Sequence, residues 1–98
     1  MFEIRLAPSG EVVMAGRLEA TQCDAALRFL EETPTLRVID LGLLEYIASS
    51  GLRVLLLTQK RLKQSGPGLQ LVNVRPQIHD IFRFAGFDRI IDMARANS

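Results

Sequence analysis

The chain has 98 residues, of which 48% are hydrophobic and 23% charged, and its net charge is +1. This length suits a single domain spanning residues 1–98 that buries enough apolar surface to fold unaided. The near-neutral charge gives no reason to expect a nucleic acid or an anionic membrane as partner. The first residues lack the basic start and apolar core of a signal peptide, and no apolar stretch is long enough to cross a bilayer.

The metal-ligating and thiol side chains are too few for a metal centre or a disulfide. Cys23 is the single cysteine, which excludes an internal disulfide and fits a reducing compartment. His79 is the single histidine and has no second ligand at a suitable spacing. The chain also lacks the glycine-rich loop ending in Gly-Lys-Ser/Thr that binds phosphates. We therefore expect a cytoplasmic protein without metal, cofactor or small-molecule substrate.

The first two predicted elements are strands joined by a short turn. Phe2, Ile4 and Leu6 alternate with charged residues, which is the period-2 pattern of a strand with one buried face. Residues 7–10, Ala-Pro-Ser-Gly, form a turn, and residues 11–18 read as a second strand antiparallel to the first.

A helix and a short buried strand follow. Apolar residues at i, i+3, i+4 and i+7 predict one face of a helix: Cys23, Ala26, Leu27 and Leu30. Thr21 and Asp24 have the spacing of a capping box at its start, and Pro34 ends it. Cys23 is expected to be a buried structural thiol on this face. Residues 37–41 are apolar on both faces, as interior parallel strands are.

Helices and strands alternate through the second half of the chain. We predict a strongly apolar helix over 52–62, a strand over 69–74, a third helix from 76 to 85, a short element over 87–91 and a frayed tail over 94–98. The order is β-β-α-β-α-β-α. It predicts an α/β domain with a mixed four- to five-stranded sheet, an antiparallel N-terminal hairpin and helices packed against the sheet.

Two adjacent hydroxyls precede Gly51 at the start of the apolar helix. Serine is a favoured N-cap that contributes about 1 kcal/mol, so Ser49 or Ser50 could cap the helix. A modification or binding role is the other interpretation that the pattern leaves open. A catalytic triad with His79 is the least favoured, because no glycine lies two residues before either serine to form a nucleophile elbow.

The region around the serines resembles a known family. Residues 40–52, DLGLLEYIASSGL, are similar to the central motif of STAS domains: a strand ending in Asp-Leu, a linker with an aromatic residue, and paired serines before Gly-Leu at a helix start. Residues 16–20, GRLEA, resemble the family's Gly-x-Leu-Asp segment. Residues 74–93 resemble its closing helix. The likeness spans nearly the whole chain and is strongest to the anti-sigma factor antagonists of bacterial partner-switching systems.

The resemblance implies a regulatory protein that is not an enzyme. Such a domain binds and sequesters a serine kinase that is also an anti-sigma factor, and releases it when the serine before the glycine, here Ser50, is phosphorylated. A serine phosphatase restores binding. Two positions depart from the family pattern, since Ala48 stands where the family has Asp before the serines and Glu19 stands where it has Asp after Gly-x-Leu.

The expected partner surface lies at the rim where these segments converge. It comprises Glu19, Tyr46, Ser49, Ser50, Leu52 and Arg53. Two alternatives remain. The domain could be a constitutive STAS interaction subunit of a larger complex, for example one associated with a transporter, that is not phosphorylated. Less favoured is a small serine-dependent enzyme that uses Ser50 and His79.

Overall fold

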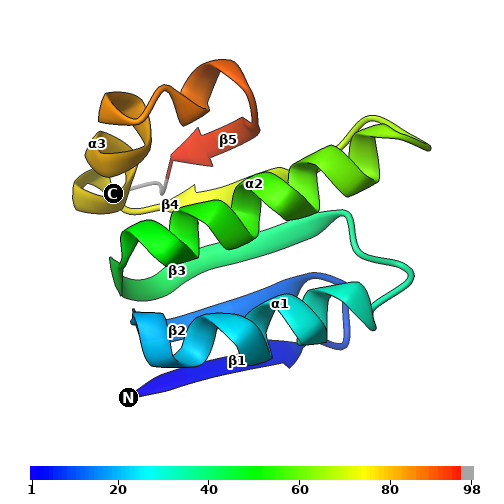
Figure 1. Cartoon of the computed structure of the whole chain (residues 1–98), viewed down its shortest axis with the longest axis horizontal. Coiled ribbons are helices and arrows are strands. Elements are labelled where there is room, and N and C mark those ends of the chain that lie inside the picture. Colours follow the sequence, from blue (N-terminus) through cyan, green and yellow to red (C-terminus); the bar gives the residue numbers. More distant parts are fainter. Residues whose placement is uncertain (96–98) are drawn as a thin grey trace.

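The computed structural model describes residues 1–95, which form one five-stranded sheet with helices (Figure 1). The elements are β1 (Phe2–Leu6), β2 (Val12–Leu18), η1 (Ala20–Gln22), α1 (Cys23–Glu31), β3 (Val38–Ile47), α2 (Ser49–Lys63), β4 (Gln70–Val74), α3 (Pro76–Phe84), η2 (Phe87–Arg89) and β5 (Asp92–Arg95). The two short η elements are turns of 3-10 helix. None of the helices in residues 1–95 is long and apolar enough to span a membrane.

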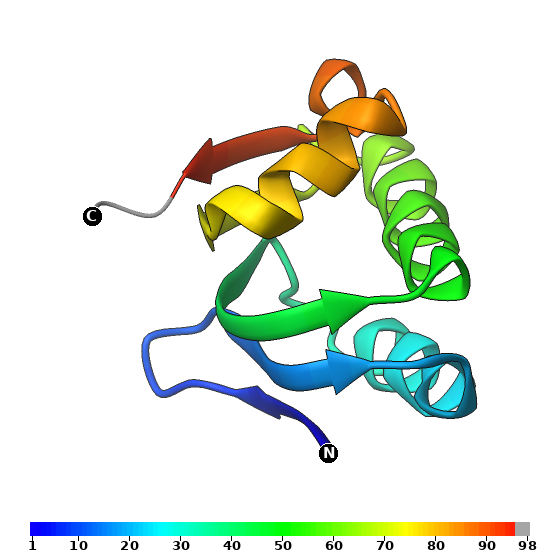
Figure 2. The same cartoon turned by 90° about the vertical axis from the view of Figure 1, so that its left-hand side faces the viewer.

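The strands lie in the sheet in the order in which they occur in the chain. The order is β1-β2-β3-β4-β5, with β1 antiparallel to β2 and every other neighbouring pair parallel. This confirms the predicted α/β class, the mixed sheet and the antiparallel N-terminal hairpin. Because the crossovers between parallel strands are right-handed, successive helices return over the same face. Figures 1 and 2 show α1 and α2 side by side across one face of the sheet.

The core lies between that face of the sheet and the helices. The residues of β2, β3 and β4 that face the helices and the apolar stripes of the helices are mostly buried. Its fully buried members include Met14, Leu18, Leu30, Ile39, Leu41, Leu44, Leu55, Leu71, Ile78 and Phe82. At the C-terminal end, the ring of Phe82 stacks on that of Phe87, with 5.9 Å between the centroids, and thereby joins α3 to η2.

A buried amide side chain ties α2 to the C-terminal part of the sheet. Gln59 is only 4% exposed. Its Nε2 donates to the carbonyl oxygen of Ile90 at 2.7 Å, and its Oε1 accepts from the backbone N–H of Leu69 at 2.7 Å. Both backbone groups belong to segments that lead into strands, so this side chain supplies hydrogen bonds that the sheet does not provide.

Strand β3 is longer than its sequence pattern predicts. The expected strand ended at residue 41, with a linker up to the serines, whereas β3 continues to Ile47. Within residues 1–95, only Ile39 and Asp40 pair on both sides; from Leu43 onward β3 pairs with β2 alone. With one neighbour and several exposed residues, this second part lacks the continuous apolar run that marks an interior strand.

Three smaller expectations are also corrected. Residues 94 and 95 belong to strand β5 and not to a frayed tail, while residues 96–98 of that tail lie outside the described residues. Helix α2 begins at Ser49, three residues before the predicted start. The reciprocal capping bonds before α1 join Glu19 and Gln22, not Thr21 and Asp24.

Replacing Gln59 by leucine tests the bridge between α2 and the C-terminal segments. We expect Gln59→Leu to lower the free energy of unfolding by about 2–3 kcal/mol, because two backbone groups lose their partner in a buried place. Urea denaturation followed by circular dichroism measures the change. The exposed Gln70 on β4 offers a matched control, for which the same substitution should change stability by less than about 0.5 kcal/mol. An equal effect of the two substitutions would contradict the assignment.

Candidate functional site

The candidate site lies at the edge of the sheet where the parallel strands end. Strand β3 passes directly into α2 through Ala48, whose backbone N–H donates to the carbonyl oxygen of Leu18 at 2.9 Å. This bond extends the pairing of β2 and β3 up to the first residue of the helix. The carboxyl edge of parallel strands is where such α/β sheets place their functional residues.

Gly51 allows the first turn of α2 to rest on the end of the sheet. It is buried, and a Cβ at this position would lie 2.7 Å from Cγ1 of Ile47 and 3.0 Å from Cδ2 of Leu18. Both distances are shorter than van der Waals contact. Because Gly51 faces the core, the preceding Ser49 is turned outward and exposed, and Ser50 is half-buried.

Neither serine caps the helix. The N-cap is Ala48, which has extended backbone angles and no side chain able to accept a hydrogen bond. Ser49 and Ser50 are the first two residues inside α2. The capping interpretation is therefore wrong, since within residues 1–95 neither hydroxyl caps the helix start.

The Ser50 hydroxyl contacts a thiol from the start of α1. Sγ of Cys23 lies 3.4 Å from Oγ of Ser50 and 3.4 Å from the carbonyl oxygen of Glu19, so its single proton serves one acceptor or the other. Cys23 is 5% exposed, as predicted for a buried thiol on the apolar face of α1. Its contact with Ser50 joins residues far apart in the sequence, and the helical spacing of Cys23 gave no sign of it. A thiol is a weak donor, so the hydroxyl of Ser50 is only loosely held.

A second group of side chains lies around Arg17. Nη2 of Arg17 is 3.8 Å from Oε1 of Glu19, and its guanidinium carbon is 4.4 Å from the centre of the Tyr46 ring. Arg17 and Tyr46 are register partners on β2 and β3, which explains their contact. The ion pair is exposed and adds little stability. Sequence reasoning named Glu19 and Tyr46 but missed Arg17, which the register of the strands alone reveals.

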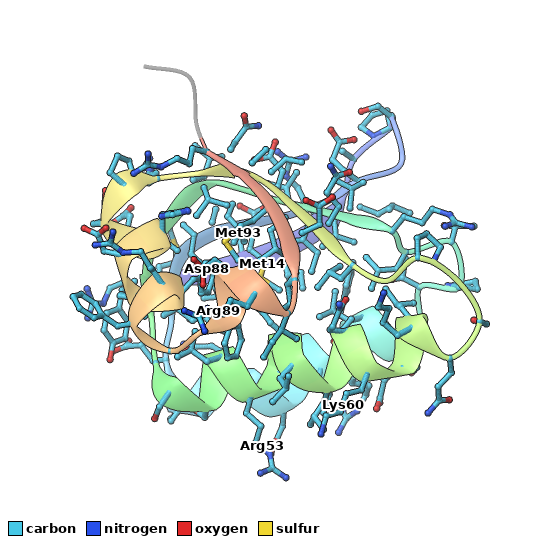
Figure 3. The ribbon with its side chains drawn as sticks, turned by 90° about the horizontal axis from the view of Figure 1, so that it is seen from above. Met14, Arg53, Lys60, Asp88, Arg89 and Met93 are labelled. Atoms are coloured by element: carbon cyan, nitrogen blue, oxygen red, sulfur yellow. The ribbon has the colours of Figure 1, made fainter. Side chains whose placement is uncertain are left out.

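The rim surface predicted from the sequence divides into two sides. The neighbours Leu18 and Ile47 face the helices and are buried, so Arg17 and Tyr46 face the other side of the sheet. Arg53 instead projects outward from α2, away from the sheet (Figure 3).

The six predicted partner residues differ in exposure. Glu19, Ser49 and Arg53 are exposed, Tyr46 is 37% exposed and Ser50 is half-buried. Leu52 is partly buried and packs against the core, so it offers a partner only part of its surface.

His79 is not joined to the serines by any hydrogen bond among the described residues. It lies on α3, and its Nδ1 is buried without a hydrogen-bond partner in residues 1–95. Ser50 is bonded to Cys23. The same part of the chain contains no group of three or more His, Cys, Asp or Glu side chains that could hold a metal ion.

Comparison with known proteins identifies a family model and a relative that match this chain. A family model described as "Mlab, STAS domain" matches residues 6–92. BtrV of Bordetella bronchiseptica, which carries the provisional name of an anti-sigma factor antagonist, is 42% identical over 59 residues. That alignment covers 60% of this chain and 51% of BtrV, so the match spans about half the length of this relative.

Solved structures share the fold. The anti-sigma factor antagonist SpoIIAA in its unphosphorylated form aligns with a TM-score of 0.73 and 19% identity, covering 96% of this chain and 88% of that one. An anti-sigma factor antagonist from Mycobacterium paratuberculosis aligns with a TM-score of 0.76 and 21% identity, covering 96% of this chain and 84% of that one. At these identities the likeness establishes the fold alone.

Introducing the missing cap tests the account of the helix start. We expect Ala48→Asp to raise the free energy of unfolding by about 1 kcal/mol, since the carboxylate would accept from a free amide of the first turn. Ser50→Ala should change stability by less than about 0.5 kcal/mol, because this hydroxyl caps nothing. Urea denaturation of both variants measures these changes. A loss of about 1 kcal/mol or more in Ser50→Ala would restore the capping interpretation.

A methyl group at position 51 tests the close approach of α2 to the sheet. Gly51→Ala should destabilise the domain by about 1–3 kcal/mol, although alanine favours helices, because Ile47 and Leu18 must move. Ser49→Ala, in the same turn but exposed, is the control and should be nearly neutral. Thermal unfolding of the two variants separates them, and a stabilised Gly51→Ala would contradict the packing described.

Proposed function

Since the STAS domain model matches residues 6–92, the chain belongs to the STAS domain family. We propose that it is an anti-sigma factor antagonist. In this proposal it is a binding module. The domain sequesters a serine kinase that is also an anti-sigma factor. When that kinase phosphorylates Ser50, the kinase is released from the domain. A serine phosphatase then removes the phosphate and restores binding. The names of BtrV and of the two antagonist structures support the role of antagonist.

The observation that carries the proposal is a serine pair at a helix start that caps nothing. Ser49 is exposed, and within residues 1–95 the hydroxyl of Ser50 is bonded only to the weakly donating thiol of Cys23. Ser50 therefore needs little rearrangement to reach a kinase. It is also the serine directly before the glycine, as the family pattern requires.

The fold can accept a phosphoryl group at this place. Phosphorylation adds about −1.5 to −2 charges and three acceptor oxygens. The amide groups at the start of α2, which Ala48 does not cap, and the positive end of the helix dipole stabilise such a group locally. A partner packed against the same turn would lose several kcal/mol of binding energy, because a dianion would enter a close-packed contact. Binding changes while the domain stays folded.

A second candidate is a constitutive STAS subunit of a larger complex. One observation favours it: Ala48 stands where the family pattern has an acidic residue before the paired serines. Such a subunit would bind a stable partner whatever the charge at position 50. Glu19, by contrast, keeps the negative charge of the family's Asp at that position, and its carboxylate lies 3.8 Å from Nη2 of Arg17.

Paired capture from a lysate of the source organism tests the proposal. We expect the wild-type domain to retain a protein with an ATP-binding serine kinase domain, and Ser50→Asp to retain at least about a hundredfold less of it. Ser65→Asp is the matched control, since it places the same charge on an exposed serine beyond the end of α2, and it should retain as much kinase as wild type.

Incubation of the retained kinase with ATP completes this test. Phosphate should appear on wild type and not on Ser50→Ala. If wild type and Ser50→Asp capture one partner equally and no phosphate is transferred, the domain is a constitutive subunit and not an antagonist.

A further inference from the structure

The outer face of α2 carries a basic stripe with an apolar centre. Ser49, Arg53, Leu57 and Lys60 follow one another at spacings of four, four and three residues, so they share one side of the helix. All four are exposed, Leu57 to 37%. Figure 3 shows Arg53 and Lys60 projecting from the same side of α2, away from the sheet. We refer to these four residues as the α2 stripe.

No acidic side chain of residues 1–95 forms an ion pair with the cations of this stripe. Helix α2 contains no Asp or Glu. The ion pairs of the described residues join Arg5 to Glu3, Arg17 to Glu19 and Arg83 to Asp80, and none involves α2.

The cations in the last turn of α2, including Lys60 of the stripe, lie where the helix dipole favours a positive charge. They are Lys60, Arg61 and Lys63, and Arg61 also donates to the carbonyl oxygen of Leu30 at 3.0 Å. Arg53 lies outside the last turn of α2, and its side chain makes no hydrogen bond or ion pair within residues 1–95.

We propose that the α2 stripe binds an acidic surface of a partner protein that offers an apolar side chain to Leu57. Charge complementarity selects the acidic surface, and the exposed leucine between the two cations favours a folded protein over a polyanion. Two cations flanking a leucine are too few for a nucleic acid, and the whole chain carries only +1. The stripe extends the rim by more than two helical turns beyond the serines.

The stripe also deepens the proposed function, on which the following step rests. Ser50 and Arg53 are three residues apart on α2 and are therefore neighbours on its surface. A phosphoryl group on Ser50 would pair with Arg53 and cancel the positive charge at one end of the stripe. An acidic partner would then lose its attraction at Arg53 and meet a dianion beside it. The sign of the partner's charge thus explains why phosphorylation releases it.

Titration with a defined peptide tests the stripe independently of any cellular partner. The probe is a short synthetic helical peptide of glutamates with one leucine in each turn, added to the 15N-labelled domain and followed by amide chemical shifts. We expect the largest shifts along α2 at residues 49, 53, 57 and 60, and weaker binding as salt is raised. The same peptide with glutamine in place of glutamate is the charge control and should bind at least about tenfold more weakly.

Charge reversals on the domain complete the experiment. Arg53→Glu and Lys60→Glu should each weaken peptide binding about tenfold, and Leu57→Ser should weaken it without changing the salt dependence. Arg5→Glu, on β1 and on the opposite face of the sheet, is the matched control and should leave the affinity unchanged.

Three results would overturn the proposal: no binding, shifts centred away from α2, or equal binding by the reversed variants. Tighter binding of duplex DNA or of anionic phosphatidylserine vesicles than of the peptide would assign the stripe to those ligands instead. If the peptide binds as expected while no kinase phosphorylates Ser50, the binding role of the α2 stripe is supported and the proposed phosphorylation switch is contradicted.

Discussion

The fold and the site both depend on the contact of Gly51 with the end of the sheet. With no Cβ at this position, the first turn of α2 lies directly on Leu18 and Ile47, the last core residues of β2 and β3. That contact fixes the rotation of α2 about its axis. Once Gly51 faces inward, Ser50 must meet Cys23 and Ser49 must face outward. It also places the α2 stripe on the side opposite the buried Val54, Leu55 and Thr58.

This arrangement separates stability from regulation. The core is closed by apolar residues and by the Gln59 bridge, and among the six predicted rim residues only Leu52 packs against it within residues 1–95. The residues at the rim make weak contacts: a hydrogen bond from the Cys23 thiol to Ser50, and an exposed ion pair between Arg17 and Glu19. A change of charge at Ser50 can therefore alter what binds the surface without disturbing what holds the domain together. Under the proposed function, phosphate on Ser50 would gain contacts with the first turn of α2 and with Arg53, and the interactions lost would lie between domain and partner.

The sequence predicts most of the sheet and helices because their apolar periodicity is strong, and it fails where pairing or capping depends on distant residues. The second half of β3 has a single neighbouring strand, and β5 is exposed at three of its four residues, so neither shows the pattern of a buried strand. Serine is a good cap in general, yet Ala48 occupies the cap because the packing of Gly51 sets where α2 starts. The pairing of Arg17 with Tyr46 and of Cys23 with Ser50 follows from strand register and helix packing, which no local pattern encodes.

In the proposed function, phosphate on Ser50 changes the surface of the domain and leaves its fold intact. The most direct measurement is the 1H–15N correlation spectrum of the domain carrying phosphoserine at position 50, compared with that of the unmodified domain. We expect large shifts only in the first two turns of α2 and in the adjoining segment around Glu19 and Cys23, with the core resonances of β2, β3 and β4 unchanged. Shifts throughout the core, or collapse of the spectrum, would show that Ser50 is a structural residue and would contradict the account.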